Sequence, residues 1–122
     1  MIPDEFDLIK NSLIDICDNY KADLILTTGG TGFSPRDVTP EATEAIIEKK
    51  VPGIPEAIRA YSLTITKRAM LSRATAGIRK NSLIINLPGS PKAVKESLEY
   101  IIDTLTHGLE ILQQKSGDCA RK

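Results

Sequence analysis

A glycine-rich loop, Gly29-Gly30-Thr31-Gly32, is the first part of the chain whose residue types could bind a ligand. It follows an apolar, β-prone run at residues 23–28. Because glycine lacks a Cβ atom, backbone N–H groups in such a loop can approach a phosphate closely. The loop matches neither the P-loop, which ends in Gly-Lys-Ser/Thr, nor the GxGxxG pattern. A tight turn without a ligand therefore stays open as the alternative.

A second loop has the same layout. The apolar run 83–87 leads into Pro88-Gly89-Ser90, and Ser90 and Pro91 would cap and begin a helix. A helix N-terminus favours an anion, although an ordinary strand-to-helix turn has the same sequence pattern. In an open parallel sheet, loops that leave the carboxyl ends of strands share one edge, where ligands bind. We therefore expect the two loops to be neighbours.

Charge is distributed unevenly along a chain whose formal net charge is zero. Residues 1–56 carry eleven acidic and five basic side chains, whereas residues 57–95 carry no acidic side chain. The latter segment contains eight basic residues: Arg59, Lys67, Arg68, Arg73, Arg79, Lys80, Lys92 and Lys95. A positive segment suits an anionic ligand, and a solvated basic face is the alternative. Few aromatic residues interleave these side chains, so nucleic acid is not expected as a partner.

Apolar spacing and turn residues predict the elements that position these loops. The predicted helices cover residues 5–20, 40–50, 55–63 and 91–112, and the predicted strands cover 23–28, 75–79 and 82–87. The first helix has an apolar stripe from Phe6 to Tyr20 with Asp4 as its N-cap, and Thr39 would cap the second. Lys80-Asn81 would join the last two strands as a tight hairpin.

Length and composition predict one α/β domain over residues 1–115 and a disordered tail at 116–122. The core must come mainly from aliphatic residues, which suits parallel strands covered by helices. No apolar run approaches the ~20 residues of a membrane span, and no signal pattern begins the chain. We expect a cytoplasmic protein without a membrane partner. Cys17 and Cys119 form no CxxC pair, which favours neither a disulfide framework nor a zinc site, and Cys17 is expected in the core.

The glycine loop is part of a longer string, TTGGTGFSPRDVTPEAT at residues 27–43, that closely resembles the signature of the MogA/MoaB family and the gephyrin G domain. Further matches are residues 2–4, 70–73, 76–79 and 83–91, so the resemblance spans residues 2 to about 112 in consistent order. It implies a three-layer α/β sandwich with a mostly parallel sheet covered by helices. It also implies N-terminal incompleteness, because the family carries a strand, loop and helix before the position of residue 2.

The resemblance implies molybdenum cofactor biosynthesis, by Mg²⁺-dependent transfer of AMP from ATP to the phosphate of molybdopterin. Joining several anions requires magnesium, positive donors and positioning more than a protein nucleophile. Asp37 and Asp4 match acidic positions of the family site and are expected to hold the magnesium, which takes one or two carboxylates and several waters. An Asx turn or cap at Asp37 and an N-cap at Asp4 are the structural alternatives.

Ser72 matches a family serine important for the pterin-nucleotide product, and a simple loop hydroxyl is its alternative. Arg73, and with less support Arg36 and Arg79, could donate to phosphate. The resemblance adds nucleotide or substrate binding for Gly29, Gly30, Thr31, Gly32, Pro88, Gly89 and Ser90. It further implies a homotrimer and a molybdenum-inserting partner enzyme.

Two other readings of the sequence are open. The first is a non-catalytic molybdopterin-binding or assembly module of the same family. The second is another enzyme on the same fold, of the MoeA or CinA type, against which the string Arg36-Asp37-Val38-Thr39-Pro40 argues. Without the family's first strand and crossover helix, the 122-residue chain is expected to be aggregation-prone or poorly folded and essentially inactive, since apolar surface and strand edges would be uncovered.

Overall fold

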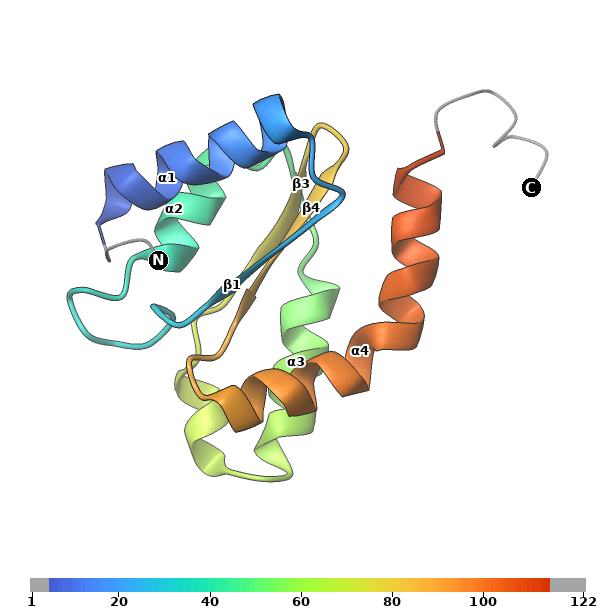
Figure 1. The fold of residues 1–122 in the computed structure, drawn as a ribbon. Helices are drawn as coiled ribbons and strands as arrows, with labels where there is room; N and C mark the ends of the chain where they lie inside the picture. The colour runs from blue at the N-terminus through green and yellow to red at the C-terminus, as the bar shows by residue number, and fades with distance from the viewer. Residues whose placement is uncertain (1–4, 115–122) are drawn as a thin grey trace.

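Four strands form one sheet in the order β1-β4-β3-β2 in the computed structural model, which describes residues 5–114. Strands β1, β3 and β4 are labelled in Figure 1. β1 (Leu24–Thr28) runs parallel to β4 (Ser82–Leu87). β3 (Ala76–Arg79) is antiparallel to both β4 and the short β2 (Lys49–Lys50). The α/β prediction is confirmed. The expected mostly parallel sheet is corrected to a mixed one over residues 5–114, because the predicted hairpin places consecutive strands side by side and so makes them antiparallel.

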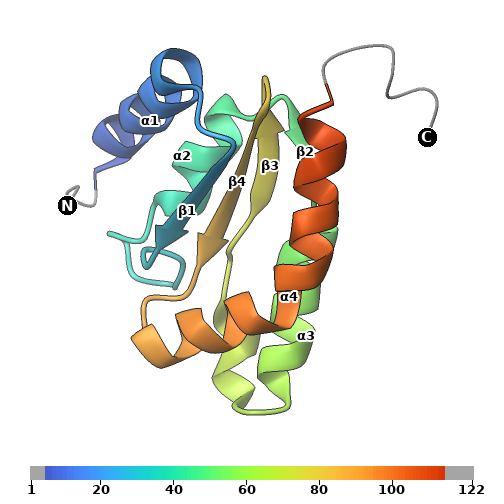
Figure 2. The same cartoon turned by 45° about the vertical axis from the view of Figure 1, so that its right-hand side comes forward.

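Helices cover both faces of the sheet, as Figure 2 shows. α1 (Phe6–Asp15), which continues as a π-helical turn over Ile16–Tyr20, and α2 (Thr39–Ile46) lie on one face. α3 (Gly53–Leu63) and α4 (Pro91–Leu112) lie on the other. The chain therefore builds three layers, with the sheet in the middle. No helix within residues 5–114 is long and apolar enough to span a membrane.

β4 is the centre of the core, and all six of its residues are buried. Successive side chains of a strand point to opposite faces, so Ile84 packs with α1 and α2 while Ile85 and Leu87 pack with α3 and α4. The strand is apolar on both faces because each face is covered by helices. Its carboxyl end, at Leu87, leads directly into Pro88-Gly89-Ser90.

Two predicted helix ends differ from the structure. α2 ends at Ile46, not near Lys50, because Ile47 is extended and the backbone N–H of Glu48 donates to the carbonyl of Ile78 at 2.7 Å. The next two residues thus join the sheet as an edge strand. The N-cap of α2 is Val38, and Thr39 is already helical.

The first helix also differs in detail from its prediction. Its N-cap is Glu5, and Asp4 lies outside the described residues, as does the predicted tail at 116–122. The buried stripe runs through Ile9, Leu13 and Cys17, which confirms Cys17 as a core residue. Tyr20, predicted at the end of the stripe, is 75% exposed, because the π-helical turn before it changes the helical period.

A partly buried ion pair closes the end of the sheet farthest from the two glycine loops. The guanidinium of Arg79 donates to both carboxylate oxygens of Asp18, at 3.0 and 3.1 Å, and to the carbonyl of Ile46 at 2.9 Å. The hydrogen bond from Arg79 holds the pKa of the Asp18 carboxyl below its ordinary value. This pair joins the π-helical turn after α1 to β3 and to the end of α2.

Asp18→Asn is expected to lower the melting temperature at pH 7, because asparagine keeps the shape of the side chain and loses its charge. Asp18 has a lowered folded-state pKa, so its stabilisation is fully present above the unfolded pKa of about 3.9 and is lost as the pH falls through the folded-state pKa. The melting temperatures of both proteins should therefore converge as the pH falls below about 3.9. Asp103→Asn, on the exposed side of α4, is the control. Equal melting temperatures of Asp18→Asn and wild type at pH 7 would contradict this role.

Candidate functional site

The two predicted ligand loops lie against each other. The backbone N–H of Gly29 donates to the carbonyl of Leu87 at 3.0 Å, which extends the parallel pairing of β1 and β4 by one residue. A Cβ atom on Gly89 would lie 3.4 Å from the Cα atom of Gly29. The expectation that the loops are neighbours is confirmed, and it follows from the parallel register of the two strands.

The shape of the first loop depends on two glycines in the left-handed region, Gly29 at φ 83° and Gly30 at φ 72°. A Cβ atom on Gly30 would collide with the hydroxyl of Thr39, whose backbone N–H donates to the carbonyl of Gly30 at 3.2 Å. The loop is thus folded tightly against the start of α2. A side chain at Gly30 would push the loop off this helix.

Three segments distant in sequence line one cavity of about 280 Å³. Thr31 and Gly32 come from the first loop, Ser72 follows the 3₁₀ helix Lys67–Leu71, and Pro88 and Gly89 come from the second loop. All five are residues that the sequence predicted for the site. The predicted residues Gly29, Gly30 and Ser90 support this cavity without lining it, and Ser90 caps α4 by accepting from the backbone N–H of Ala93 at 3.4 Å.

A larger cavity of about 690 Å³ lies between α3, α4 and the sheet. Its lining contains aliphatic residues, Tyr100, Thr104 and two glycines, and no charged side chain. A phosphate buried there would have no charged partner, which makes the site unsuitable for it. The smaller cavity between the loops is therefore the candidate site for an anionic ligand.

Asp37 closes its own turn at the end of the first loop. Its Oδ2 accepts from the backbone N–H of Ser34 at 3.0 Å, and its N–H donates to the carbonyl of Ser34 at 2.9 Å. A Cβ atom on Gly32 would lie 2.9 Å from the same carboxylate oxygen, so the glycine makes room for it. The turn considered as an alternative is therefore present. It leaves the carboxylate half-buried beside the loop.

One carboxylate at the loop meets the minimum that magnesium requires, since this ion takes one or two carboxylates and fills its shell with waters. Within residues 5–114 no three metal-ligating side chains cluster, so the described part of the chain forms no all-protein metal cage. Asp4, the second predicted ligand, lies outside the described residues.

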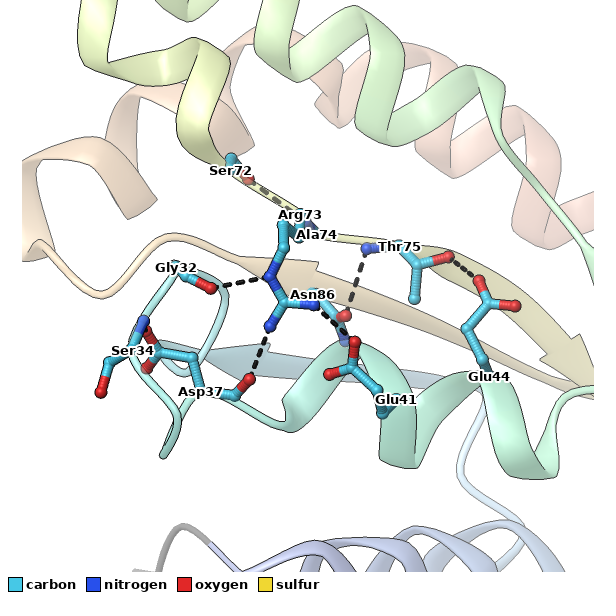
Figure 3. A network of polar contacts seen from close by, with 10 residues as sticks. All are labelled: Gly32, Ser34, Asp37, Glu41, Glu44, Ser72, Arg73, Ala74, Thr75 and Asn86. Atoms are coloured by element: carbon cyan, nitrogen blue, oxygen red, sulfur yellow. Dashed lines mark hydrogen bonds and ion pairs between the residues drawn. The ribbon is translucent and has the colours of Figure 1, made fainter.

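Arg73 ties the segments of the site together (Figure 3). Its Nε donates to the carbonyl of Gly32 at 2.7 Å, its Nη2 donates to the carbonyl of Asp37, and its Nη1 pairs with the carboxylate of Glu41. Its backbone N–H also donates to the carbonyl of Thr31 at 2.9 Å. The hydrogen bond from Arg73 keeps the pKa of the Glu41 carboxyl below its ordinary value. Arg73 thus fixes the glycine loop relative to the adjacent Ser72.

Arg73 was predicted as a phosphate donor. In the structure it is not among the residues that line the cavity, and its three guanidinium nitrogens each bind the protein. The other two arginines named from the sequence lie elsewhere. Arg79 pairs with Asp18 at the far end of β3, and Arg36 is exposed on the loop.

Ser72 combines a backbone role with an accessible hydroxyl. Its Oγ accepts from the backbone N–H of Ala74 at 3.2 Å, and its carbonyl accepts from Nη1 of Arg59 at 3.4 Å. A hydroxyl that accepts one hydrogen bond keeps its own hydrogen for donation. The Ser72 side chain is therefore able to donate to an anion in the cavity that it lines.

Asn86 was missed by the sequence reasoning. It is 1% exposed, its Nδ2 donates to the hydroxyls of Thr27 and Thr43 at 3.0 Å each, and its Oδ1 accepts from the backbone N–H of Thr75 at 3.2 Å. These bonds connect β1, α2, β4 and the start of β3 directly beneath the loops. The available signal was a polar residue inside the apolar run 83–87.

Comparison with known proteins agrees with this geometry. A family model described as "Probable molybdopterin binding domain" matches residues 1–107. The chain is 49% identical over 112 residues to a molybdopterin adenylyltransferase from Helicobacter pylori strain ATCC 700392 / 26695, and 45% identical over 113 residues to one from Escherichia coli K12. These matches cover 92% and 89% of this chain, but 64% and 58% of the relatives. The chain thus spans less than two thirds of the length of these relatives.

Solved structures show the same fold. A molybdopterin biosynthesis enzyme MoaB from Thermus thermophilus superposes with a TM-score of 0.86 at 49% identity, over 93% of this chain and 71% of that one. The Mog protein from Mycobacterium ulcerans superposes with a TM-score of 0.83 at 39% identity, over 87% and 69%. The two glycine loops and the cavity between them thus lie on a MoaB/Mog fold. The chain belongs to the molybdopterin-binding domain family of molybdenum cofactor biosynthesis.

Proposed function

We propose that this chain forms the substrate site of a molybdopterin adenylyltransferase, which transfers AMP from ATP to the phosphate of molybdopterin. One observation carries the proposal. Thr31 and Gly32 of the glycine loop, Ser72 and Pro88-Gly89 line a single cavity in a chain that is 49% identical to a protein named molybdopterin adenylyltransferase. In the reaction, a phosphate oxygen of molybdopterin attacks the α-phosphorus of ATP. The bond from that phosphorus to the β-phosphate oxygen breaks, and pyrophosphate leaves.

The residues of the site suit a reaction between anions, which depends on positioning and charge stabilisation more than on a protein nucleophile. Thr31 and Gly32 bring backbone groups to the cavity, and Ser72 offers a hydroxyl donor. Asp37, together with Asp4, would hold magnesium. When bound, that ion supplies positive charge to the phosphates.

The remaining parts of the proposal rest on the resemblance to the MogA/MoaB family. They are a homotrimer, a cytoplasmic location and delivery of the adenylylated product to a molybdenum-inserting enzyme. Analytical ultracentrifugation of the full-length natural protein tests the first of these, with a mass of three chains expected.

A binding or assembly module is the second candidate. One observation favours it: the described residues offer few free carboxylates for magnesium beside the cavity. Glu41, at the start of α2, is paired with Arg73, which leaves Asp37 on the glycine loop. Titration of the full-length natural protein with molybdopterin, in the presence of ATP and magnesium, separates the two functions. Saturable binding without pyrophosphate release would identify the module, and release that depends on molybdopterin would identify the transferase.

Ser72→Ala is expected to lower turnover about 10-fold or more, because removing a hydrogen bond to a charged group costs roughly 1.5–3 kcal/mol. The melting temperature should change little, since the hydroxyl accepts a single bond in a loop. Turnover and thermal unfolding should be measured on the same preparation of the full-length natural protein. Ser12→Ala, which removes a half-buried hydroxyl from α1 outside the cavity lining, is the matched control and should leave turnover unchanged. A large loss of stability with unchanged turnover per folded molecule would show that Ser72 is only structural.

A further inference from the structure

The basic segment 57–95 is only partly neutralised by the protein. Of its eight basic side chains, three form ion pairs with acids from the first half of the chain: Arg73 with Glu41, and Arg79 and Lys80 with Asp18. Within residues 5–114 the other five have no ion pair, and these are Arg59, Lys67, Arg68, Lys92 and Lys95. Their positive charges can therefore attract an external anion.

Two of these five side chains line the cavity between the glycine loops. Arg59 comes from α3 and Arg68 from the 3₁₀ helix, and no acidic residue lines the same cavity. Both arginines belong to residues 58–72, which form the wall that ends at Ser72. Thr31 and Gly32 form another wall, on the glycine loop. The lining of this mainly apolar cavity thus includes two basic residues and no acidic one.

Arg59 is held in place without being neutralised. Its Nη1 donates to the carbonyls of Ser72 and Ala74, at 3.4 and 3.0 Å, and these acceptors carry no formal charge. Arg68 is exposed at the cavity, and its backbone N–H donates to the hydroxyl of Thr66 at 3.3 Å. A fixed guanidinium and an adaptable one, both uncompensated, form a strong attraction for an anion with several acceptor oxygens.

The size of the cavity limits what part of a ligand these arginines can bind. About 280 Å³ lies just below the roughly 300–1,000 Å³ typical of small-molecule sites. Such a space holds a fragment of a substrate rather than a nucleotide and a pterin together. The charge of the lining selects the phosphate-bearing fragment.

We propose that Arg59 and Arg68 bind a phosphate group of the substrate, on the cavity wall that carries Ser72. Arg73, the arginine predicted from the sequence for this task, is instead a positioning residue that holds the loop. The inference rests on the proposed function only in the identity of the substrate. The phosphate belongs either to the pyrophosphate end of ATP or to molybdopterin, and both present the same chemistry to a guanidinium pair.

Binding of inorganic pyrophosphate, measured by calorimetry on the full-length natural protein, tests the inference without requiring turnover. Arg68→Gln is expected to raise the dissociation constant about 10-fold or more, since a hydrogen bond to a charged group is lost. Lys49→Gln removes the same charge from the exposed edge strand β2, outside the cavity lining, and should change the constant less than about twofold. Equal dissociation constants for Arg68→Gln and wild type would overturn the proposal.

Kinetics then identify the phosphate. If Arg68→Gln raises the KM for ATP alone, the arginines bind the phosphates of ATP. If it raises the KM for molybdopterin alone, they bind the pterin phosphate.

If neither KM changes while the wild type turns over, the inference fails and the transferase function stands. If pyrophosphate binding depends on Arg68 but the wild type has no transferase activity, the anion site stands and the proposed function fails.

Discussion

Asp37→Asn is expected to lower the rate of adenylyl transfer about 100-fold, which corresponds to about 2.7 kcal/mol of lost transition-state stabilisation. The expected loss follows from the charge, because asparagine cannot replace a carboxylate as a magnesium ligand. The fold should persist. An asparagine oxygen can still accept the hydrogen bond that the backbone N–H of Ser34 donates to Asp37 at 3.0 Å. Initial rates in the full-length natural protein, at ATP and magnesium concentrations that saturate the wild type, measure the effect.

The same substitution at Asp103, exposed on α4, serves as the matched control and should leave the rate unchanged. Raising the magnesium concentration separates weaker metal binding from a lost catalytic group, since only the former is rescued. A rate for Asp37→Asn within a few-fold of the wild type would show that Asp37 only closes its turn.

Gly30→Ala is the change with the largest expected effect on stability, a loss of about 3 kcal/mol in the free energy of unfolding. A left-handed backbone costs a residue with a Cβ atom about 1–2 kcal/mol, and overpacking costs about 1–3 kcal/mol more. Both costs apply here, because Gly30 has φ 72° and its Cβ atom would collide with the buried Thr39. Urea unfolding of the variant measures the sum.

Gly53→Ala provides a control of opposite sign. Gly53 begins α3 with no positive φ, and a Cβ atom there would meet nothing within 4 Å. Alanine should therefore raise the free energy of unfolding by about 0.4–1 kcal/mol, because it restricts the unfolded chain. If Gly30→Ala proved as stable as the wild type, the tight packing of the glycine loop on α2 would be refuted.

Local sequence patterns predicted the parts of the site that depend on neighbouring residues. The Ser90-Pro91 start of α4, the Lys80-Asn81 hairpin and the meeting of the Gly29 and Gly89 loops all follow from turn residues and strand direction. Ser72 lines one cavity with residues of both loops, and its role toward a ligand stays a prediction.

Contacts between distant residues could not be predicted in this way. Arg73 follows Ser72 in the sequence, which suggested a ligand, but its side chain meets Gly32 and Glu41, which lie 41 and 32 residues away. Asn86 is the one polar residue in the apolar run 83–87, and this was its only signal in the sequence. Its hydrogen-bond partners come from three other segments. The end of α2 was misplaced because the pairing of Glu48 with Ile78 outweighs the helical tendency of its own segment.

The direct test of the account is a product balance on the full-length natural protein. ATP, magnesium and molybdopterin are supplied together, and pyrophosphate and adenylyl-molybdopterin are quantified at each time point. We expect the two products to appear in equal amounts, with no pyrophosphate when molybdopterin is omitted and with a rate that falls in Ser72→Ala and Asp37→Asn. Binding of molybdopterin with neither product, or pyrophosphate release that does not depend on molybdopterin, would contradict the account.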